Sequence, residues 1–270
     1  MSETLRNSND RPELALALAG GGSYAIAVQM AIVETLQEEY GIEAQNAEIL
    51  GTSGGSVSGG LIVSGKTYED VENIPQISFP NYKPGYMKGV MNEVFGDEYA
   101  FNLRAMAFEV PHMRAAKLRD HSIADKAAAS STIPGLFLPH HIDGKLYVDG
   151  GVRSITSADV APRAHNLITI SAFARHFKPP VGNLRIPAGQ FLEHRLNRQM
   201  KTWQRKHGGK AVHIYPDAEV SNMVKGANDV LDFELAKDVY WKMKEEGCES
   251  LRKNEVFLRE LASTSMYAIS

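Results

Sequence analysis

Short apolar runs alternate with stretches of helical periodicity in the first part of the chain. Residues 14–19 are a continuous run of Leu and Ala that ends in three glycines, which predicts a buried parallel strand and a tight turn. Apolar positions from Ile26 to Leu36 then recur with helical spacing, and Gly41 predicts the end of that helix. A second short strand, 48–50, leads into a helix of small residues that reaches Val63. This order of elements indicates a βαβ unit and the α/β class.

The middle of the chain has a less regular pattern. Pro75, Pro80 and Pro84 interrupt residues 66–110, so we expect an irregular loop packed on the core, or else a lid or an apolar wall over a site. Farther on, the pattern predicts a helix over 122–131, then strands over 145–148, 166–171 and 211–215, and helices from about Asn228 and Glu249. We expect a single domain over residues 13–270 behind a flexible tail, 1–12.

Composition is that of an ordinary globular protein. The 270 residues are 43% hydrophobic and 23% charged, with a formal net charge of −3, which excludes a disordered, collagen-like or coiled-coil chain. The single cysteine, Cys248, excludes an intramolecular disulfide and a cysteine-rich zinc site. The polar first twelve residues show no signal peptide, and no apolar run is long enough to span a bilayer. A cytoplasmic protein is expected.

Positive charge is concentrated in residues 175–210, where nine Lys and Arg stand against one acid, a net of +8. On a helical wheel an apolar stripe runs through this segment: Leu192, Leu196, Met200 and Trp203. The pattern is typical of a surface helix packed on a sheet, and also of a basic helix lying on anionic lipid. In the second case the candidate membrane contacts are Arg198, Lys201, Trp203 and Arg205. Nucleic-acid binding is not expected, because no motif and no overall basic charge supports it.

Gly51-Thr52-Ser53-Gly54-Gly55 has the G-x-S-x-G form and lies between a predicted strand and a predicted helix. A serine on such a sharp turn has an unobstructed hydroxyl, and the glycines allow that backbone. The N–H of Gly54 and the helix dipole would face charge that develops on an attacked carbonyl. The position therefore predicts a nucleophilic Ser53, and the alternative is a structural glycine-rich turn.

Gly20, Gly21 and Gly22 follow the first strand and open the first helix, where free backbone N–H groups are able to hold an oxyanion or a phosphate. Gly20-x-Gly22-x-x-Ala25 also fits the dinucleotide-binding fingerprint. That cofactor requires an acid at the end of the second strand, where this chain has Gly51-Thr52-Ser53. No cofactor is therefore expected.

Asp149, Gly150 and Gly151 end a short predicted strand. An acid followed by two glycines forms a plain turn, or it places a carboxylate at the carboxyl edge of a parallel sheet, where α/β sites form. Because Ser53 is predicted at such an edge, the serine and the carboxylate are able to meet.

These blocks resemble the patatin-like phospholipases, a family of serine lipid acyl hydrolases. The glycine loop, the Ser53 turn and the Asp149 block occur in the family's order. The stretch Ala129-Ser-Ser-Thr-Ile-Pro-Gly-Leu-Phe-Leu-Pro139, which leads to Asp149, is the more distinctive match. The resemblance implies a three-layer α/β fold in which helices flank a mostly parallel central sheet.

The resemblance also implies a Ser–Asp dyad with no histidine, cofactor or metal. Ser53 would be the nucleophile and Asp149 the general base, while backbone N–H groups of Gly20, Gly21, Gly22 and Gly54 form the oxyanion hole. The motif glycines are Gly51, Gly55, Gly150 and Gly151. Tyr24 and Ala25 stand where family members usually have Arg or Lys and then Gly, so anion binding or head-group preference is expected to differ.

A Ser–Asp–His triad is the rival arrangement, because five histidines follow Asp149: His165, His176, His194, His207 and His213. Only one βα unit precedes Ser53, which is too few for the strands that an α/β-hydrolase places there. His140 and His141 are expected to be a loop pair, since no carboxylate or cysteine accompanies them at ligand spacing.

The expected activity is hydrolysis of lipid carboxylic esters, of phospholipase A or lysophospholipase type, through an acyl-enzyme. The alternatives are a transacylase with the same dyad and a lipid-binding pseudoenzyme. The expected partners are the lipid ester and an anionic membrane at which the protein is peripheral. The oligomeric state is not indicated.

Overall fold

The computed structural model describes residues 11–72, 77–173, 175–178, 180–181, 184–185, 188–226 and 228–267. Of the tail expected over 1–12, residues 1–10 therefore lie outside the described part. Arg11 and Pro12 are attached rather than free: the Arg11 guanidinium donates to the carbonyl of Ala164, and the Pro12 carbonyl accepts from His165 N–H. Within the described residues, no helix has both the length and the apolar character needed to cross a bilayer.

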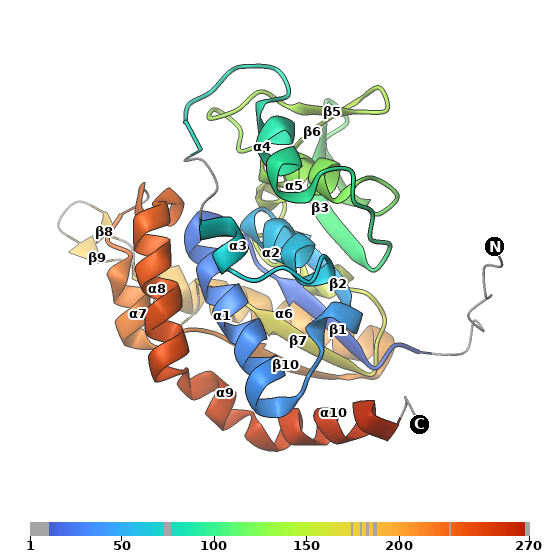
Figure 1. The fold of residues 1–270 in the computed structure, drawn as a ribbon, viewed down its shortest axis with the longest axis vertical. Coiled ribbons are helices and arrows are strands. Elements are labelled where there is room, and N and C mark those ends of the chain that lie inside the picture. The colour runs from blue at the N-terminus through green and yellow to red at the C-terminus, as the bar shows by residue number, and fades with distance from the viewer. Residues whose placement is uncertain are drawn as a thin grey trace.

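A mixed sheet of eight strands forms the centre of the molecule (Figure 1). Seven follow one another in the order β10 (Lys210–Ile214), β7 (Asn166–Ile170), β1 (Leu14–Leu18), β2 (Glu48–Thr52), β3 (Leu103–Val110), β6 (Lys145–Asp149) and β5 (His140–Ile142). The eighth, β4 (Arg114–Leu118), pairs with β3 alone. From β10 to β3 every pairing is parallel, which confirms the mostly parallel sheet.

Three strands meet on β3. β2 pairs in parallel with Leu103–Met106, and β6 pairs antiparallel with Ala107–Val110. β4 pairs with residues 105–109 and so overlaps both registers. Because a strand has two edges, β4 occupies one edge while β2 and β6 share the other. The carboxyl ends of β2 and β6 therefore face each other over neighbouring residues of β3.

Helices cover both faces of the sheet, which confirms the three-layer architecture (Figure 1). The alternating side chains of β1 separate the two layers. Leu14, Leu16 and Leu18 belong to a core cluster shared with the helices on one face. These are α1 (Gly22–Tyr40), α2 (Gly54–Val63), α4 (Tyr86–Phe95), α5 (Ile123–Ser131) and α8 (Phe233–Glu246). Ala15 and Ala17 face the other way, toward α6 (Ala188–His207).

Besides four short 3-10 helices, the described chain contains further α-helices and strands. They are α3 (Glu69–Glu72), α7 (Ala218–Met223), α9 (Glu249–Lys253), α10 (Glu255–Tyr267) and the strands β8 (Pro180–Val181) and β9 (Leu184–Arg185). Asp232 caps α8, because its carboxylate accepts from the N–H groups of Glu234 and Leu235.

The expectation of an irregular segment over 66–110 was wrong, since it contains α3, α4 and the whole of β3. Charged residues concealed this strand in the sequence. Arg104 forms an ion pair with Glu48 at the start of β2. Glu109 is buried, and Arg114 and His112 bind its carboxylate. The Arg114 guanidinium is the main reason that the pKa of Glu109 is lowered. Ion pairs with neighbouring strands thus stabilise charged residues in β3, which the hydrophobic periodicity did not indicate as a strand.

The assignment of Trp203 as a membrane contact is also wrong. Its side chain is 0% exposed, it packs with Leu196 and Met200 against the sheet, and its indole N–H donates to the carbonyl of Pro162 at 3.0 Å. The small side chains of Ala15 and Ala17 leave room for the indole on this face. The apolar stripe of α6 is therefore a core stripe.

Trp203→Ala should lower the free energy of unfolding by about 3–5 kcal/mol, because it opens a large cavity in the core. Chemical denaturation measures this quantity. Arg198→Ala, on the exposed side of the same helix, should change it by no more than about 0.5 kcal/mol. Similar small values for both variants would contradict the burial of this indole.

Candidate active site

Ser53 occupies the turn between β2 and α2, with φ 52° and ψ −127°. Positive φ is strained for a serine, and it is typical of the turn that projects a nucleophile. The neighbouring glycines allow close backbone approach. A Cβ on Gly51 would lie 2.3 Å from the Gly55 carbonyl oxygen, and one on Gly55 would lie 2.2 Å from that of Leu18. The turn is thus wedged against the end of β1, which fixes its direction.

The hydroxyl of Ser130 fixes the same turn from α5. It accepts the backbone N–H of Ser53 at 2.8 Å and donates to the carbonyl of Met106, on β3, at 2.6 Å. Ser130 is 0% exposed, so both contacts are shielded from water. Sequence reasoning included Ser130 in the Ala129–Pro139 block without assigning it a role. Because the Ser53 N–H is already bonded to Ser130, an oxyanion at this site would have to be bound by other N–H groups.

The glycine loop lies directly against the Ser53 turn. A Cβ on Gly54 would lie 2.5 Å from the Gly22 carbonyl oxygen. Gly22, with φ 58°, begins α1, whose first N–H groups have no partner within the helix. Among the described residues, Gly21, Gly22 and Gly54 have no hydrogen-bond acceptor for their N–H groups. Gly20 is the exception and corrects our prediction, since its N–H donates to the carbonyl of Ile155 at 2.8 Å.

Asp149 ends β6 and is 6% exposed. One carboxylate oxygen accepts the N–H of Gly151 at 2.6 Å, and Ser53 lies close enough to influence the protonation of this carboxyl. Burial raises the pKa of Asp149, although the influence of Ser53 and the Gly151 N–H acts in the opposite direction. The carboxyl edge of a parallel strand was the expected place. The strand is instead antiparallel to β3 and approaches Ser53 from the opposite direction.

Two apolar hollows meet at Ser53 and Gly22. One is lined by Val57 of α2, by Met87, Val90, Met91 and Val94 of α4, and by residues from the segments before and after them. The other extends past Asp149 to Val152, Phe173, Phe177, Leu192 and Val230. The apolar wall considered for residues 66–110 is therefore present as α4. In the part of the chain that is described, Asp149 is the only charged residue among those lining the two hollows.

Tyr24 and Ala25 replace a basic residue and a glycine without opening the loop. Tyr24 is buried, and its ring lies 5.7 Å from that of Phe173. The ring of Phe173 in turn covers Gly21, because a Cβ there would lie 2.7 Å from it. An aromatic cover thus replaces a cation beside the glycine loop.

The five downstream histidines do not line either hollow in the described residues. His213 hydrogen-bonds with Ser171, and burial lowers the pKa of its imidazole to about 3. His140 and His141 lie in β5 rather than in a loop, and His140 binds Asp125 at 3.0 Å. No His, Cys, Asp and Glu cluster suited to a metal occurs among the described residues.

The structure brings together Ser53 at positive φ, the buried Asp149 carboxyl and the backbone of Gly21 and Gly22, which all line one hollow. The sequence model of the patatin-like phospholipases matches residues 74–162, which include Asp149 and the Ala129–Pro139 block. The predicted resemblance to this family is thereby confirmed. The glycine loop and Ser53 lie outside the matched segment.

Among solved structures, the crystal structure of VipD from Legionella pneumophila is similar, with 12% sequence identity and a TM-score of 0.40. The match covers 60% of this chain and 50% of that chain. The chain thus spans about half of the VipD chain.

Ser130→Ala should lower kcat by at least about tenfold, because the turn that positions Ser53 loses a hydrogen bond. A tenfold decrease corresponds to about 1.4 kcal/mol in activation free energy. Ser250→Ala is the matched control. The buried Ser250 hydroxyl likewise accepts a backbone N–H and donates to a carbonyl, both of Tyr215. Each variant leaves buried groups unpaired and should cost about 1–3 kcal/mol of stability. Equal kcat values in the two variants would show that Ser130 has a structural role only.

Proposed function

We propose that this protein hydrolyses lipid acyl esters through an acyl-enzyme on Ser53, with Asp149 as general base. The placement of Ser53 and the buried Asp149 carboxyl in one hollow, where two apolar hollows meet, is the observation that carries the proposal. An apolar site of this kind suits an ester with a long hydrocarbon chain. A phospholipase A or lysophospholipase type of reaction is the finer assignment that we propose.

In the first step the Ser53 oxygen bonds to the ester carbonyl carbon, and its proton passes to Asp149. The N–H groups of Gly21, Gly22 and Gly54 are proposed to bind the oxyanion. The carbon–oxygen bond to the alcohol then breaks, and Asp149 returns the proton to the leaving oxygen. In the second step water attacks the acyl-Ser53, Asp149 accepts a proton from the water, and the fatty acid leaves as Ser53 regains its proton.

Two alternatives use the same residues. A transacylase would pass the acyl group from Ser53 to a second alcohol, and a pseudoenzyme would bind the lipid without forming an acyl-enzyme. The aromatic cover over Gly21 is the feature that motivates the second alternative. A cytoplasmic location with peripheral contact to a membrane is part of the proposal.

Ser53→Ala and Asp149→Asn should each abolish hydrolysis of a short-chain ester while the protein stays folded. Loss of a nucleophile or of a general base costs at least about 10²-fold in rate. A fluorophosphonate probe should label the wild type and not Ser53→Ala. Hydrolysis by either variant at close to the wild-type rate would contradict the dyad.

Histidine substitutions provide the control for this experiment. Single changes to Asn or Gln at His165, His176, His194, His207 and His213 should each alter the rate by well under tenfold. A folded variant among them that loses about 10²-fold would favour a Ser–Asp–His triad instead.

Asp149 should also produce a distinctive pH dependence. A base acts when ionised, and the pKa of Asp149 is raised, so activity should fall with decreasing pH at values above the ordinary Asp pKa of about 3.9. The folded state favours the neutral carboxyl, hence ionisation costs stability once the pH exceeds the unfolded pKa. Asp149→Asn should therefore unfold at a higher temperature than the wild type at pH 7, and this gain should shrink toward pH 4. A lower melting temperature at pH 7 would contradict the burial argument.

A further inference from the structure

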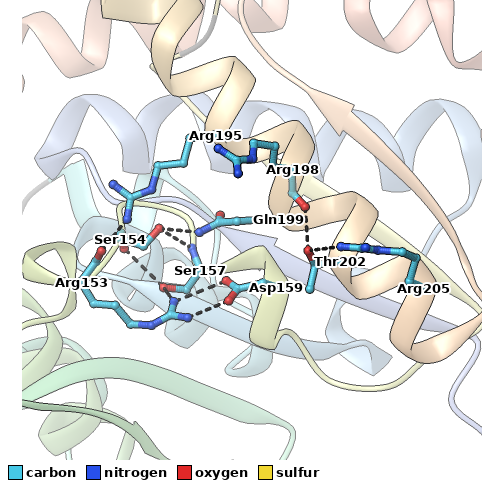
Figure 2. Close-up of polar contacts among 9 residues, drawn as sticks. All are labelled: Arg153, Ser154, Ser157, Asp159, Arg195, Arg198, Gln199, Thr202 and Arg205. Carbon is cyan, nitrogen blue, oxygen red and sulfur yellow. Dashed lines mark hydrogen bonds and ion pairs between the residues drawn. The ribbon is translucent and has the colours of Figure 1, made fainter.

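The exposed side of α6 carries a stripe with three arginines and a phenylalanine at one end. Arg195, Arg198, Thr202 and Arg205 recur at helical spacing and lie along one side of the helix (Figure 2). Phe191 precedes Arg195 at the same spacing in the sequence. This side faces away from the buried stripe of Leu196, Met200 and Trp203. In Figure 2 the guanidinium of Arg198 makes no contact with the residues drawn. In the described part of the chain, no carboxylate forms an ion pair with Arg198, Lys201 or Arg205.

Positive charge from neighbouring elements adds to this surface. Burial lowers the pKa of Lys117, on β4, and the charges of Lys206, Arg104 and Arg153 lower it further. The pKa of His207 is lowered by burial and then by Lys206, Arg11 and Arg163. These mutual effects require that the cations lie close together in space. Arg104 and Arg153 are paired with Glu48 and Asp159. The net positive charge therefore comes from Lys117, Lys206 and the exposed cations of α6, and this surface draws anions.

The stripe ends beside the mouth of the second hollow. Phe191 is 69% exposed, and the next residue, Leu192, lines that hollow with Val152, which is itself 52% exposed. Val152 is thus an exposed apolar side chain of the hollow that contains Ser53, and Phe191 is a second exposed apolar side chain one residue before Leu192. A bilayer accepts both the apolar end and the arginines of this stripe.

Hydrogen bonds join the basic helix to the loop after Asp149 (Figure 2). Arg195 donates to the Arg153 carbonyl at 2.7 Å, and Gln199 donates to the Ser154 hydroxyl at 2.9 Å. The carbonyl of Ile155, in the same loop, holds Gly20. Arg153 itself is neutralised by Asp159 at 2.7 Å. These hydrogen bonds fix α6 relative to the active site, so a surface that docks on α6 has a fixed position relative to Ser53.

We propose that this side of α6 docks on an anionic bilayer, with Phe191 and Val152 entering the interface and the mouth of the hollow facing the lipid. The proposal rests on the proposed function only for the identity of the substrate. Docking itself requires no catalysis, so it is tested in the Ser53→Ala background.

The test is binding of Ser53→Ala protein to vesicles of phosphatidylcholine alone or with phosphatidylserine. Binding should be tighter with phosphatidylserine and should weaken as salt screens the charges. Adding Arg198→Glu and Arg205→Glu should weaken binding at least about 30-fold, since each basic residue near such a surface contributes about a factor of five. Lys83→Glu with Lys145→Glu is the control with the same change in net charge on exposed residues elsewhere, and it should stay within about threefold of the parent.

The apolar contribution to vesicle binding is tested with a second pair of variants. Phe191→Ser should weaken binding to vesicles about tenfold, while Phe101→Ser, which removes a ring that is 60% exposed, should not. With Ser53 restored, Phe191→Ser should slow hydrolysis of vesicle lipid and leave hydrolysis of a soluble short-chain ester unchanged. Failure of the soluble reaction in the wild type would instead count against the proposed function.

Three results would overturn the docking surface. The first is an equal loss of vesicle binding in the two double charge-reversal variants. The second is equal binding to both kinds of vesicle. The third is release of the protein from vesicles by an RNA oligonucleotide at a concentration below that of the lipid.

Discussion

The arrangement of β2 and β6 on one edge of β3 is the constraint on which the site depends. β2 ends opposite Met106 and β6 ends opposite Ala107. Two chain segments that arrive from opposite directions must therefore turn away within one residue of each other. Glycine is required where they turn, since a Cβ on Gly150 would lie 2.2 Å from the Met106 carbonyl oxygen. The serine and the carboxylate come together because the strands that carry them have no room to continue.

The same crowding determines the electrostatics of the site. Residues that close the space around Asp149 also remove water from it, which raises its pKa. A carboxylate with a raised pKa is a stronger base. Because its ionised form is disfavoured in the folded state, this higher proton affinity lowers the stability of the fold at neutral pH. Ser130 limits the disorder that such strain would cause, because it binds both the Ser53 N–H and β3. Rigidity is thus supplied by a buried hydroxyl rather than by a further charge.

Local sequence patterns predicted the elements whose structure depends mainly on residues within the element itself. The run at 14–19, the glycine turns and the helix after Ser53 belong to this group. β3 could not be predicted in this way, because its Arg104 and Glu109 are satisfied by residues on other strands. The N–H of Gly20 is a similar case. Its acceptor, Ile155, is remote in the sequence, so a glycine count overestimated the number of free donors.

The amphipathic pattern of α6 gave the right helix and left its orientation open. An apolar stripe that contains a tryptophan suits a membrane as well as a core, and the sequence alone does not decide between them. The decision comes from β1, whose Ala15 and Ala17 leave a space on the α6 face that the Trp203 indole fills. Once this stripe is committed to the core, Phe191 is the one large apolar side chain on the basic side of the helix. Its position beside Leu192 connects the outer surface of α6 to the hollow that leads to Ser53. The two sides of one helix therefore have separate tasks, since one is bound to the sheet and the other is free to meet a charged surface.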